Sequence, residues 1–175
     1  MKTVVILLSD KRSGSTMLQE AICAHPKVQT VNYSPHTYLE THHWLKAAVL
    51  LGVNSSLFSN GKTYKNYGSK KNARIYLESE ILGNLPNYTI PNDDKQLIFE
   101  SWEALCDNFA QPIFLEKSPQ HLAHWGAISL LLEWAQQSKN YKIKIIGLVR
   151  NPLAVLYSAF KLFSSQPQQR QFSWL

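Results

Sequence analysis

The N-terminal segment combines a short apolar run with a polar turn. Val4–Leu8 reads V-V-I-L-L, a continuous run of the kind that forms a strand buried on both faces of a parallel sheet. The turn S-D-K-R-S-G-S-T follows at 9–16, and M-L-Q-E-A-I-C-A continues with helical character. Strand, turn and helix in immediate succession constrain the fold more than any other feature, because such units build a parallel sheet covered by helices.

The same turn predicts an anion-binding site. The backbone N–H groups of Ser13–Thr16 would point at one spot at the start of the helix, where the helix dipole adds partial positive charge. Arg12 supplies a full charge, and Ser15 and Thr16 supply hydroxyl donors. Gly14 permits a turn geometry or a close approach that a Cβ would hinder. We therefore expect a phosphate-like ligand; the alternative is an ordinary strand–helix turn rich in small residues.

The turn departs from the loop of nucleoside triphosphatases, which reads G-x-x-x-x-G-K-[ST]. Aligned on Gly14, Ser9 stands where the first glycine belongs and Ser15 stands where the lysine belongs. That lysine contacts the β- and γ-phosphates in the triphosphatases. Its absence argues against ATP or GTP hydrolysis, but it is compatible with a 5′-phosphate that carries one further acidic group. A divergent P-loop kinase stays open as an alternative.

A second segment has the same organisation near the other end of the chain. Lys142–Val149 reads as a buried strand, Arg150 follows it, and Pro152 suits the first turn of a helix. Ser158 then lies two turns into that helix. Because ligands bind at the carboxyl ends of the strands in open α/β sheets, we expect Arg150 and Ser158 to grip a second phosphate of the same ligand. The alternative is a helix-capping arginine and a small packing serine.

Strands alternate with helices along the chain, which predicts an α/β fold, a three-layer sandwich with a parallel sheet like that of the P-loop NTPases. A hydrophobic content of 45% and a charged content of 17% are those of a globular protein, and a single domain over 1–175 accounts for the length. The expected strands are 3–9, 28–33, 113–115 and 143–149. The expected helices are 16–24, 38–51, 73–82, 122–137, 152–163 and one capped by Asp93 or Asp94 that runs to Phe109, with a long loop at 53–71.

The charge and the cysteine content indicate which binding partners and which cellular compartment to expect. The formal net charge is +6, but the basic residues are scattered; the densest group, within 62–74, reads first as a solvated loop or lid and second as a contact for an acidic substrate. We expect no nucleic-acid partner. Cys23 and Cys106 are too few and too far apart for a metal cluster or a disulfide framework, which suits a reducing compartment. Val4–Leu8 is too short for a signal peptide or a membrane anchor, so we expect a cytoplasmic protein that does not associate with membranes.

The two phosphate-binding segments together resemble the sulfotransferase superfamily. K-R-S-G-S-T-M-L is similar to that family's 5′-phosphosulfate loop, and L-V-R-N-P-L-A-V-L-Y-S-A-F is similar to its 3′-phosphate motif, an Arg followed by a Ser eight residues later. The resemblance implies that the sulfuryl donor is 3′-phosphoadenylyl sulfate (PAPS) and that the acceptor is a hydroxyl group of a carbohydrate or another alcohol. The donor would then contact Arg12, Ser13, Gly14, Ser15, Thr16, Arg150 and Ser158.

A third segment adds to this resemblance. Phe114–Pro119 reads F-L-E-K-S-P and is similar to the E-K-[ST]-P segment of carbohydrate sulfotransferases. By that resemblance Lys117 would stabilise charge on the transferring group. The alternative is a lysine at the end of a strand, in water, with Glu116 beside it.

Sulfuryl transfer also requires a general base that takes the proton of the acceptor hydroxyl. The resemblance places this base soon after the first helix, where His36 lies just beyond the expected second strand and Glu40 lies four residues further on. If Thr37 starts a helix, both side chains would face the cleft, and His36 is preferred because it lies nearer the strand end. His42 and His43 are adjacent, so on a helix their side chains would point in different directions and they cannot both serve as the base. H-x-x-x-E-x-H-H matches no metal-site pattern, and we expect no metal.

The C-terminal segment is polar and Gln-rich, S-S-Q-P-Q-Q-R-Q-F-S-W-L. It does not resemble the Gly- and basic-rich segment with which the family covers the adenosine of the donor. The single domain is therefore expected to be incomplete at its C-terminus. A non-catalytic remnant that binds PAPS or its desulfated product, 3′-phosphoadenosine 5′-phosphate (PAP), stays open as a second function.

Overall fold

The structure is a computed structural model that describes residues 2–53 and 68–163. The strands in this part of the chain are Lys2–Ser9 (β1), Val28–Gln29 (β2), Ile113–Lys117 (β3) and Tyr141–Leu148 (β4). The α-helices are Ser15–Cys23 (α1), His43–Leu51 (α2), Lys70–Asn84 (α3), Asp94–Phe109 (α4), Trp125–Gln137 (α5) and Pro152–Phe163 (α6). Two short 3-10 helices lie at Thr37–Leu39 (η1) and Pro119–His121 (η2).

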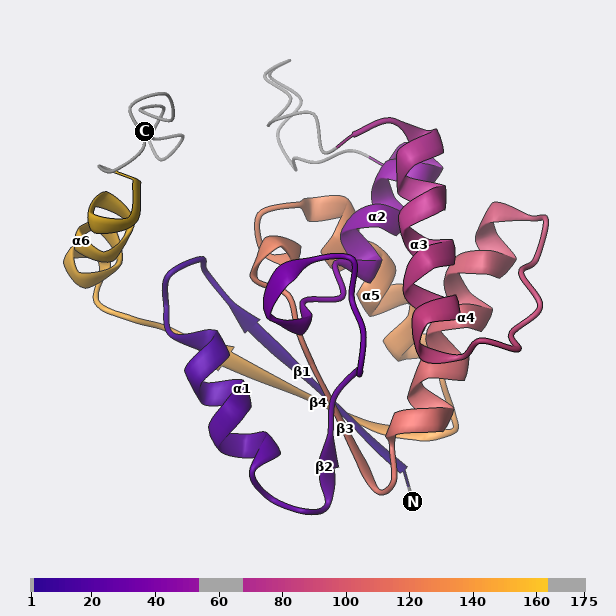
Figure 1. The fold of residues 1–175 in the computed structure, drawn as a ribbon, viewed down its shortest axis with the longest axis horizontal. Helices are drawn as coiled ribbons and strands as arrows, with labels where there is room; N and C mark the ends of the chain where they lie inside the picture. The colour runs from indigo at the N-terminus through magenta and orange to yellow at the C-terminus, as the bar shows by residue number, and fades with distance from the viewer. Residues whose placement is uncertain (1, 54–67, 164–175) are drawn as a thin grey trace.

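The strands form one parallel sheet in the order β2-β3-β1-β4. Val4 in β1 pairs with Phe114 on one side and with Ile143 on the other. Figure 1 shows α1 on one side of the sheet and α2 to α5 gathered on the other. The predicted α/β fold with a parallel sheet is confirmed. Because the strands are parallel, the ends of β1, β3 and β4 that precede the expected site residues lie along the same edge.

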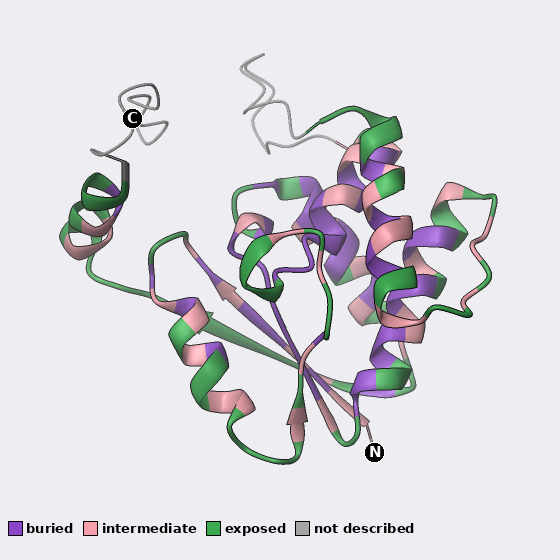
Figure 2. Ribbon diagram, viewed as in Figure 1, coloured by how far each residue is buried: buried purple, intermediate pink, exposed green. Residues whose placement is uncertain are grey.

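An aromatic core fills the space between the sheet and α2, α4 and α5. Trp44, Trp102 and Trp134 are at most 2% exposed, and Trp102 lies 5.2 Å from Trp44 and 5.7 Å from Trp134 between ring centroids. The ring of Phe114 in β3 packs 5.8 Å from Trp102. Figure 2 shows that β1 and β3 are largely buried whereas β4 is mostly exposed. The core therefore braces β3, the strand that carries Lys117.

Side-chain caps explain where α4 and α5 begin. Asp93, one of the two caps that the sequence predicts, caps α4, because its side chain accepts from the amide of Gln96 at 2.8 Å. His124 caps α5 in the same way, so that helix begins at Trp125 and not at the predicted Leu122. The predicted strand after α1 is also shorter than expected and covers only Val28–Gln29.

The helix predicted over Tyr38–Leu51 is wrong in its first part. Tyr38 and Leu39 have φ angles of 59° and 51°, and His42 has 51°, so the backbone leaves the right-handed helical region three times before α2 begins at His43. Glu40 consequently lies in an irregular loop and not on a helix. The predicted loop at 53–71 falls mostly outside the described residues.

Within the described residues no helix is long and apolar enough to cross a membrane. Cys23 and Cys106 are both free thiols; Cys106 is buried, whereas Cys23 is only partly buried. The cytoplasmic location stays a prediction.

Candidate functional site

The turn between β1 and α1 contains a left-handed glycine. Gly14 has a φ of 91° and is the N-cap residue of α1. A Cβ at this position would meet no atom within 4 Å, so the backbone conformation, and not the space around it, requires glycine. Arg12 also has a positive φ, 66°, which is uncommon for a residue with a side chain and strains the turn. The strained turn places the start of α1 at the carboxyl end of β1.

The start of α1 offers hydrogen-bond donors. Ser15 is its first residue, and the first N–H groups of a helix have no carbonyl partner within the helix. The amide of Ser13 differs from its sequence expectation, because it donates to the carbonyl oxygen of Asp10 at 3.3 Å and so belongs to the turn itself. The other amides and the helix dipole form an electropositive end of the kind that binds anions.

Two segments far apart in the sequence meet at this turn. The guanidinium of Arg12 donates two hydrogen bonds to Ser158 Oγ, from Nε at 3.2 Å and from Nη2 at 3.1 Å. Arg150 donates from Nη1 to the carbonyl oxygen of Arg12 at 3.1 Å. The structure thus brings together the residues of both predicted phosphate-binding segments.

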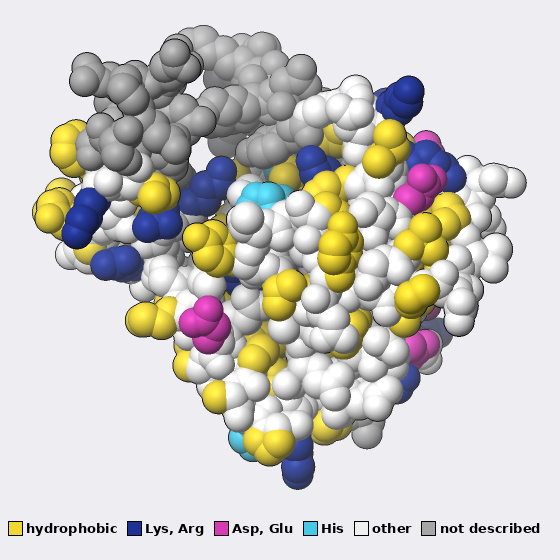
Figure 3. All heavy atoms as spheres, viewed as in Figure 1, with side chains coloured by type: hydrophobic (Ala, Val, Ile, Leu, Met, Phe, Trp, Pro, Cys, Tyr) yellow, Lys and Arg dark blue, Asp and Glu magenta, His cyan; other side chains and the backbone are white. Residues whose placement is uncertain are grey.

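A cleft of about 480 Å³ opens between the turn and α6. Lys11, Arg12 and Arg150 contribute positive charge to it, and Leu122 and Leu156 contribute apolar wall. Figure 3 shows Lys and Arg side chains gathered on the side of the molecule that carries α6. A ligand that combines anionic groups with an apolar ring system would match these walls.

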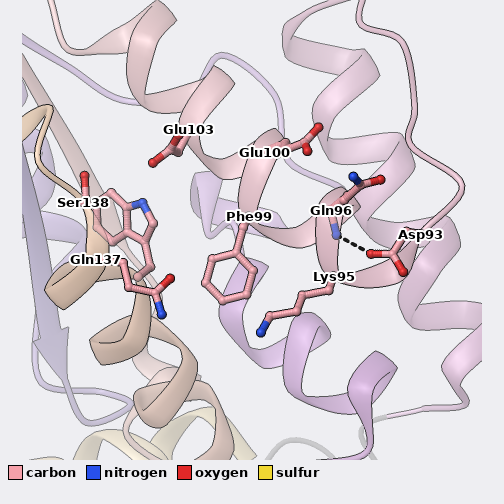
Figure 4. Close-up of a pocket in the computed structure, with 9 residues that line it drawn as sticks. Asp93, Lys95, Gln96, Phe99, Glu100, Glu103, Gln137 and Ser138 are labelled. Carbon is pink, nitrogen blue, oxygen red and sulfur yellow. Dashed lines mark hydrogen bonds between the residues drawn. The ribbon is translucent and has the colours of Figure 1, made fainter.

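A second hollow, of about 360 Å³, lies between α4 and the end of α5 (Figure 4). Phe99, Glu100 and Glu103 line it from α4, and Gln137 lines it from α5. Because α5 ends shortly before β4 begins, this hollow lies toward the amino ends of the strands. It contains none of the predicted site residues, and its three carboxylates outnumber its one cation, Lys95, which disfavours an anionic ligand.

Lys117 connects the start of α1 with the loop that carries Glu40. Its side chain is fully buried, so the reading of a strand-end lysine in water is wrong. Its ammonium lies 2.9 Å from Glu40 Oε1 and donates to Thr16 Oγ1 at 3.2 Å and to the carbonyl oxygen of Tyr38 at 3.4 Å. A buried cation is thereby held beside the electropositive start of α1.

Glu40 is the centre of a charged cluster. Its second carboxylate oxygen, Oε2, lies 3.0 Å from His42 Nε2 and 3.5 Å from His36 Nδ1. Burial by itself raises the pKa of the Glu40 carboxyl, but hydrogen bonds from His42 and Lys117 outweigh it and hold the pKa below its ordinary value. Burial lowers the pKa of His42, and the bond to Glu40 offsets this only in part. Glu40 is therefore ionised and His42 is neutral near pH 7.

His36 is the member of this cluster that reaches solvent. Its side chain is 37% exposed, whereas those of Glu40 and His42 are 8% and 6% exposed. Nδ1 also lies 3.0 Å from the carbonyl oxygen of Thr37, so a proton on Nδ1 has two acceptors. That tautomer leaves the lone pair on Nε2 free to accept a proton. Glu40, with both oxygens in contacts, is better placed to orient His36 than to act as the base.

A buried carboxylate beneath the cluster holds the loop in place. Glu116 Oε1 accepts from Thr41 Oγ1 at 2.8 Å and from Ser118 Oγ at 2.6 Å. Ser118 Oγ in turn accepts from the backbone amide of His42 at 3.0 Å. Burial raises the pKa of Glu116 to about 7, against the opposing effect of these two hydroxyl donors. Thr41, which follows Glu40, is thus hydrogen-bonded to both chain neighbours of Lys117, Glu116 and Ser118.

Sequence reasoning missed Thr41 and Ser118 as parts of the site. Ser118 lies inside the E-K-S-P segment, so the sequence motif could have pointed to it. The motif could not have shown which residues Ser118 contacts. Thr41 gave no signal, because a single threonine beside two histidines has no distinctive pattern. His36, Glu40 and Lys117, which the sequence singled out, lie in one connected cluster.

Comparison with known proteins agrees with the resemblance seen in the sequence. A family model described as the Sulfotransferase family matches residues 5–174, which include the turn, the E-K-S-P segment and α6. No curated protein and no solved structure matches the chain significantly.

Proposed function

The chain belongs to the sulfotransferase family, and on that premise we propose that it transfers a sulfuryl group from PAPS to a hydroxyl acceptor. The observation that carries the proposal is the contact of Arg12 with Ser158 beside Arg150. It joins the residues expected at the 5′-phosphosulfate with those expected at the 3′-phosphate, as a single ligand with both groups would require.

Donor binding rests on the cleft between the turn and α6. The 5′-phosphosulfate of PAPS would lie at the start of α1, within reach of Arg12 and Thr16. The 3′-phosphate would accept from Arg150 and Ser158. Arg12 and Ser158 now bond to each other, and each would exchange that bond for one to a phosphate oxygen. A hydrogen bond to a charged phosphate oxygen is stronger than the bond between Arg12 and the neutral Ser158 hydroxyl that it would replace.

The transfer step follows from the cluster around Glu40. The acceptor hydroxyl attacks sulfur; the new O–S bond forms as the bond from sulfur to the bridging phosphate oxygen breaks. His36 Nε2 takes the hydroxyl proton, and Glu40 holds the ring through Nδ1. Negative charge that builds on the leaving PAP faces the Lys117 ammonium, which already reaches Thr16 at the start of α1. A carbohydrate hydroxyl is the acceptor favoured by the E-K-S-P segment.

Calorimetric titration with PAP in the absence of metal tests donor binding. Arg12→Ala and Arg150→Ala should each weaken binding by roughly 10- to 100-fold, because each removes a charge-assisted contact. Lys139→Ala is the matched control, since Lys139 is an exposed cation at the amino end of β4. Unchanged PAP affinity in both arginine variants would contradict the proposal.

Two further measurements separate the alternatives. Tight binding of ATP with Mg²⁺ but not of PAP would favour a divergent kinase. PAP binding without transfer from PAPS to any of a panel of glycan and phenol acceptors would favour a non-catalytic binding protein.

A further inference from the structure

We propose that His36, Glu40 and His42 form a binding site for one divalent transition-metal ion of the Zn²⁺ type. All three come from the loop between β2 and α2, and one ligand atom from each lies within 4.8 Å of the other two. The spacing H-x-x-x-E-x-H gave no metal pattern in the sequence, because the loop and not a helix or strand brings these atoms together.

The distances between the ligand atoms fit a tetrahedral site. Donor atoms around a tetrahedral Zn²⁺ lie roughly 3.3 Å apart, because each bond is about 2.0–2.2 Å long. Glu40 Oε2 lies 3.0 Å from His42 Nε2 and 3.5 Å from His36 Nδ1. The two imidazole rings lie side by side, with centroids 4.1 Å apart. Two imidazole nitrogens and one carboxylate oxygen are also a ligand set that Zn²⁺ accepts in proteins.

The loop holds these ligands before any metal arrives. Positive φ angles at Tyr38, Leu39 and His42 are costly, and such strain persists where the surrounding structure enforces it. Ser118 fixes the backbone of His42, and the ring of Tyr76 stacks on the His42 ring at 6.4 Å. Ligands held in this way lose little entropy on binding an ion.

Solvent beside His36 and the charge of Lys117 determine which kind of metal site the three ligands can form. His36 faces solvent, so a water molecule can complete the coordination, as in zinc sites with three protein ligands. Lys117 donates a hydrogen bond to Glu40 Oε1, so Oε2 is the carboxylate oxygen that would bind the metal. Its positive charge nearby weakens cation binding, so the affinity should lie below that of a structural zinc site.

Metal binding would switch off the proposed base. An ion on His36 Nδ1 forces the ring proton onto Nε2, which can then no longer accept the proton of an acceptor hydroxyl. This consequence rests on the proposed function, whereas the metal site itself does not.

Titration of the metal-free full chain with Zn²⁺ by calorimetry, and with Co²⁺ by visible absorption, tests the site. We expect one equivalent of each ion and the intense d–d bands of four-coordinate Co²⁺. His36→Gln and Glu40→Gln should each weaken binding by at least about tenfold, since even the loss of an outer-shell partner costs 10- to 100-fold. His25→Gln, at an exposed histidine after α1, should bind as the wild type does. Circular dichroism of each variant checks its fold.

Absence of a one-equivalent site, or equal affinity in folded His36→Gln, Glu40→Gln and wild-type chains, would overturn the metal site. In a transfer assay, Zn²⁺ should inhibit and a chelator should restore the rate. A chain that binds Zn²⁺ in the expected way but transfers nothing from PAPS would contradict the proposed function and leave the metal site standing.

Discussion

The ammonium of Lys117 lies 2.9 Å from the carboxylate of Glu40, and neither side chain is more than 8% exposed. Lys117 is the last residue of β3, whereas Glu40 lies in the loop before α2. A buried ion pair between two elements fixes their relative position, because separating the charges would leave each one in a poorly solvated site without the opposite charge beside it. The pair therefore sets where the loop with His36 sits relative to the start of α1.

Replacement of Lys117 should affect stability and transfer together. Lys117→Met leaves the buried Glu40 carboxylate without its ammonium partner, so we expect the free energy of unfolding to fall by about 3–5 kcal/mol in urea denaturation. The double variant Lys117→Met with Glu40→Gln should recover part of that loss, since neither member of the pair is then charged. Both variants should lose kcat while the PAP dissociation constant changes little, as for a contact made mainly in the transition state. A loss confined to PAP affinity would contradict this role.

Variants and a pH profile together distinguish His36 from Glu40 as the base. The pKa of Glu40 is held below its ordinary value, so its ionisation adds no acid limb at neutral pH. We expect a 10²- to 10⁴-fold lower kcat in His36→Gln, about the usual worth of a general base. An acid limb that the wild type shows in kcat near neutral pH should disappear in that variant. Full activity in that variant would move the base elsewhere.

Thr41 should act as a positioning residue. Thr41→Val keeps the shape of the side chain but removes the O–H group that Glu116 accepts at 2.8 Å. We expect a stability loss of about 1–3 kcal/mol and a lower kcat at unchanged PAP affinity, because the loop with Glu40 is less firmly held. Thr41→Ser restores the hydroxyl and should restore kcat. Equal kcat in the valine and serine variants would show that the hydroxyl has no positioning role.

Glu116 should make stability depend on pH in a recognisable way. Burial raises its pKa from 4.5 to about 7, so the folded chain binds a proton more tightly than the unfolded chain does. The resulting stabilisation is fully present below pH 4.5 and is lost as the pH rises through 7. Across this window it amounts to about 3 kcal/mol.

The comparison with Glu116→Gln isolates this contribution from those of the neighbouring histidines. The amide does not titrate, so the free energy of unfolding of the wild type minus that of the variant should fall by about 3 kcal/mol between pH 4.5 and pH 8. Urea denaturation at several pH values measures this difference. A constant difference would mean that Glu116 is ionised throughout.

The sequence alone predicted the fold class and singled out the residues that we propose to hold the sulfuryl donor. An apolar run, a turn with Gly14 and a helix form a local unit whose periodicity can be read without tertiary structure. The second such unit, with Arg150 and Ser158, follows the same rule. The order of these units predicted that their ends would lie on one edge of a parallel sheet, and they do.

The tertiary structure alone decided which side chains meet at that edge. Arg12 and Ser158 are 146 residues apart in sequence, and only the register of β1 with β4 brings them within 3.2 Å. The helix predicted from Tyr38 begins at His43, because contacts made by Glu40 and Thr41 with β3 outweigh the local helical pattern. The charge states of Glu40 and Glu116 follow the same logic: burial and hydrogen-bond partners set a pKa, and both depend on packing between segments that are distant in the chain.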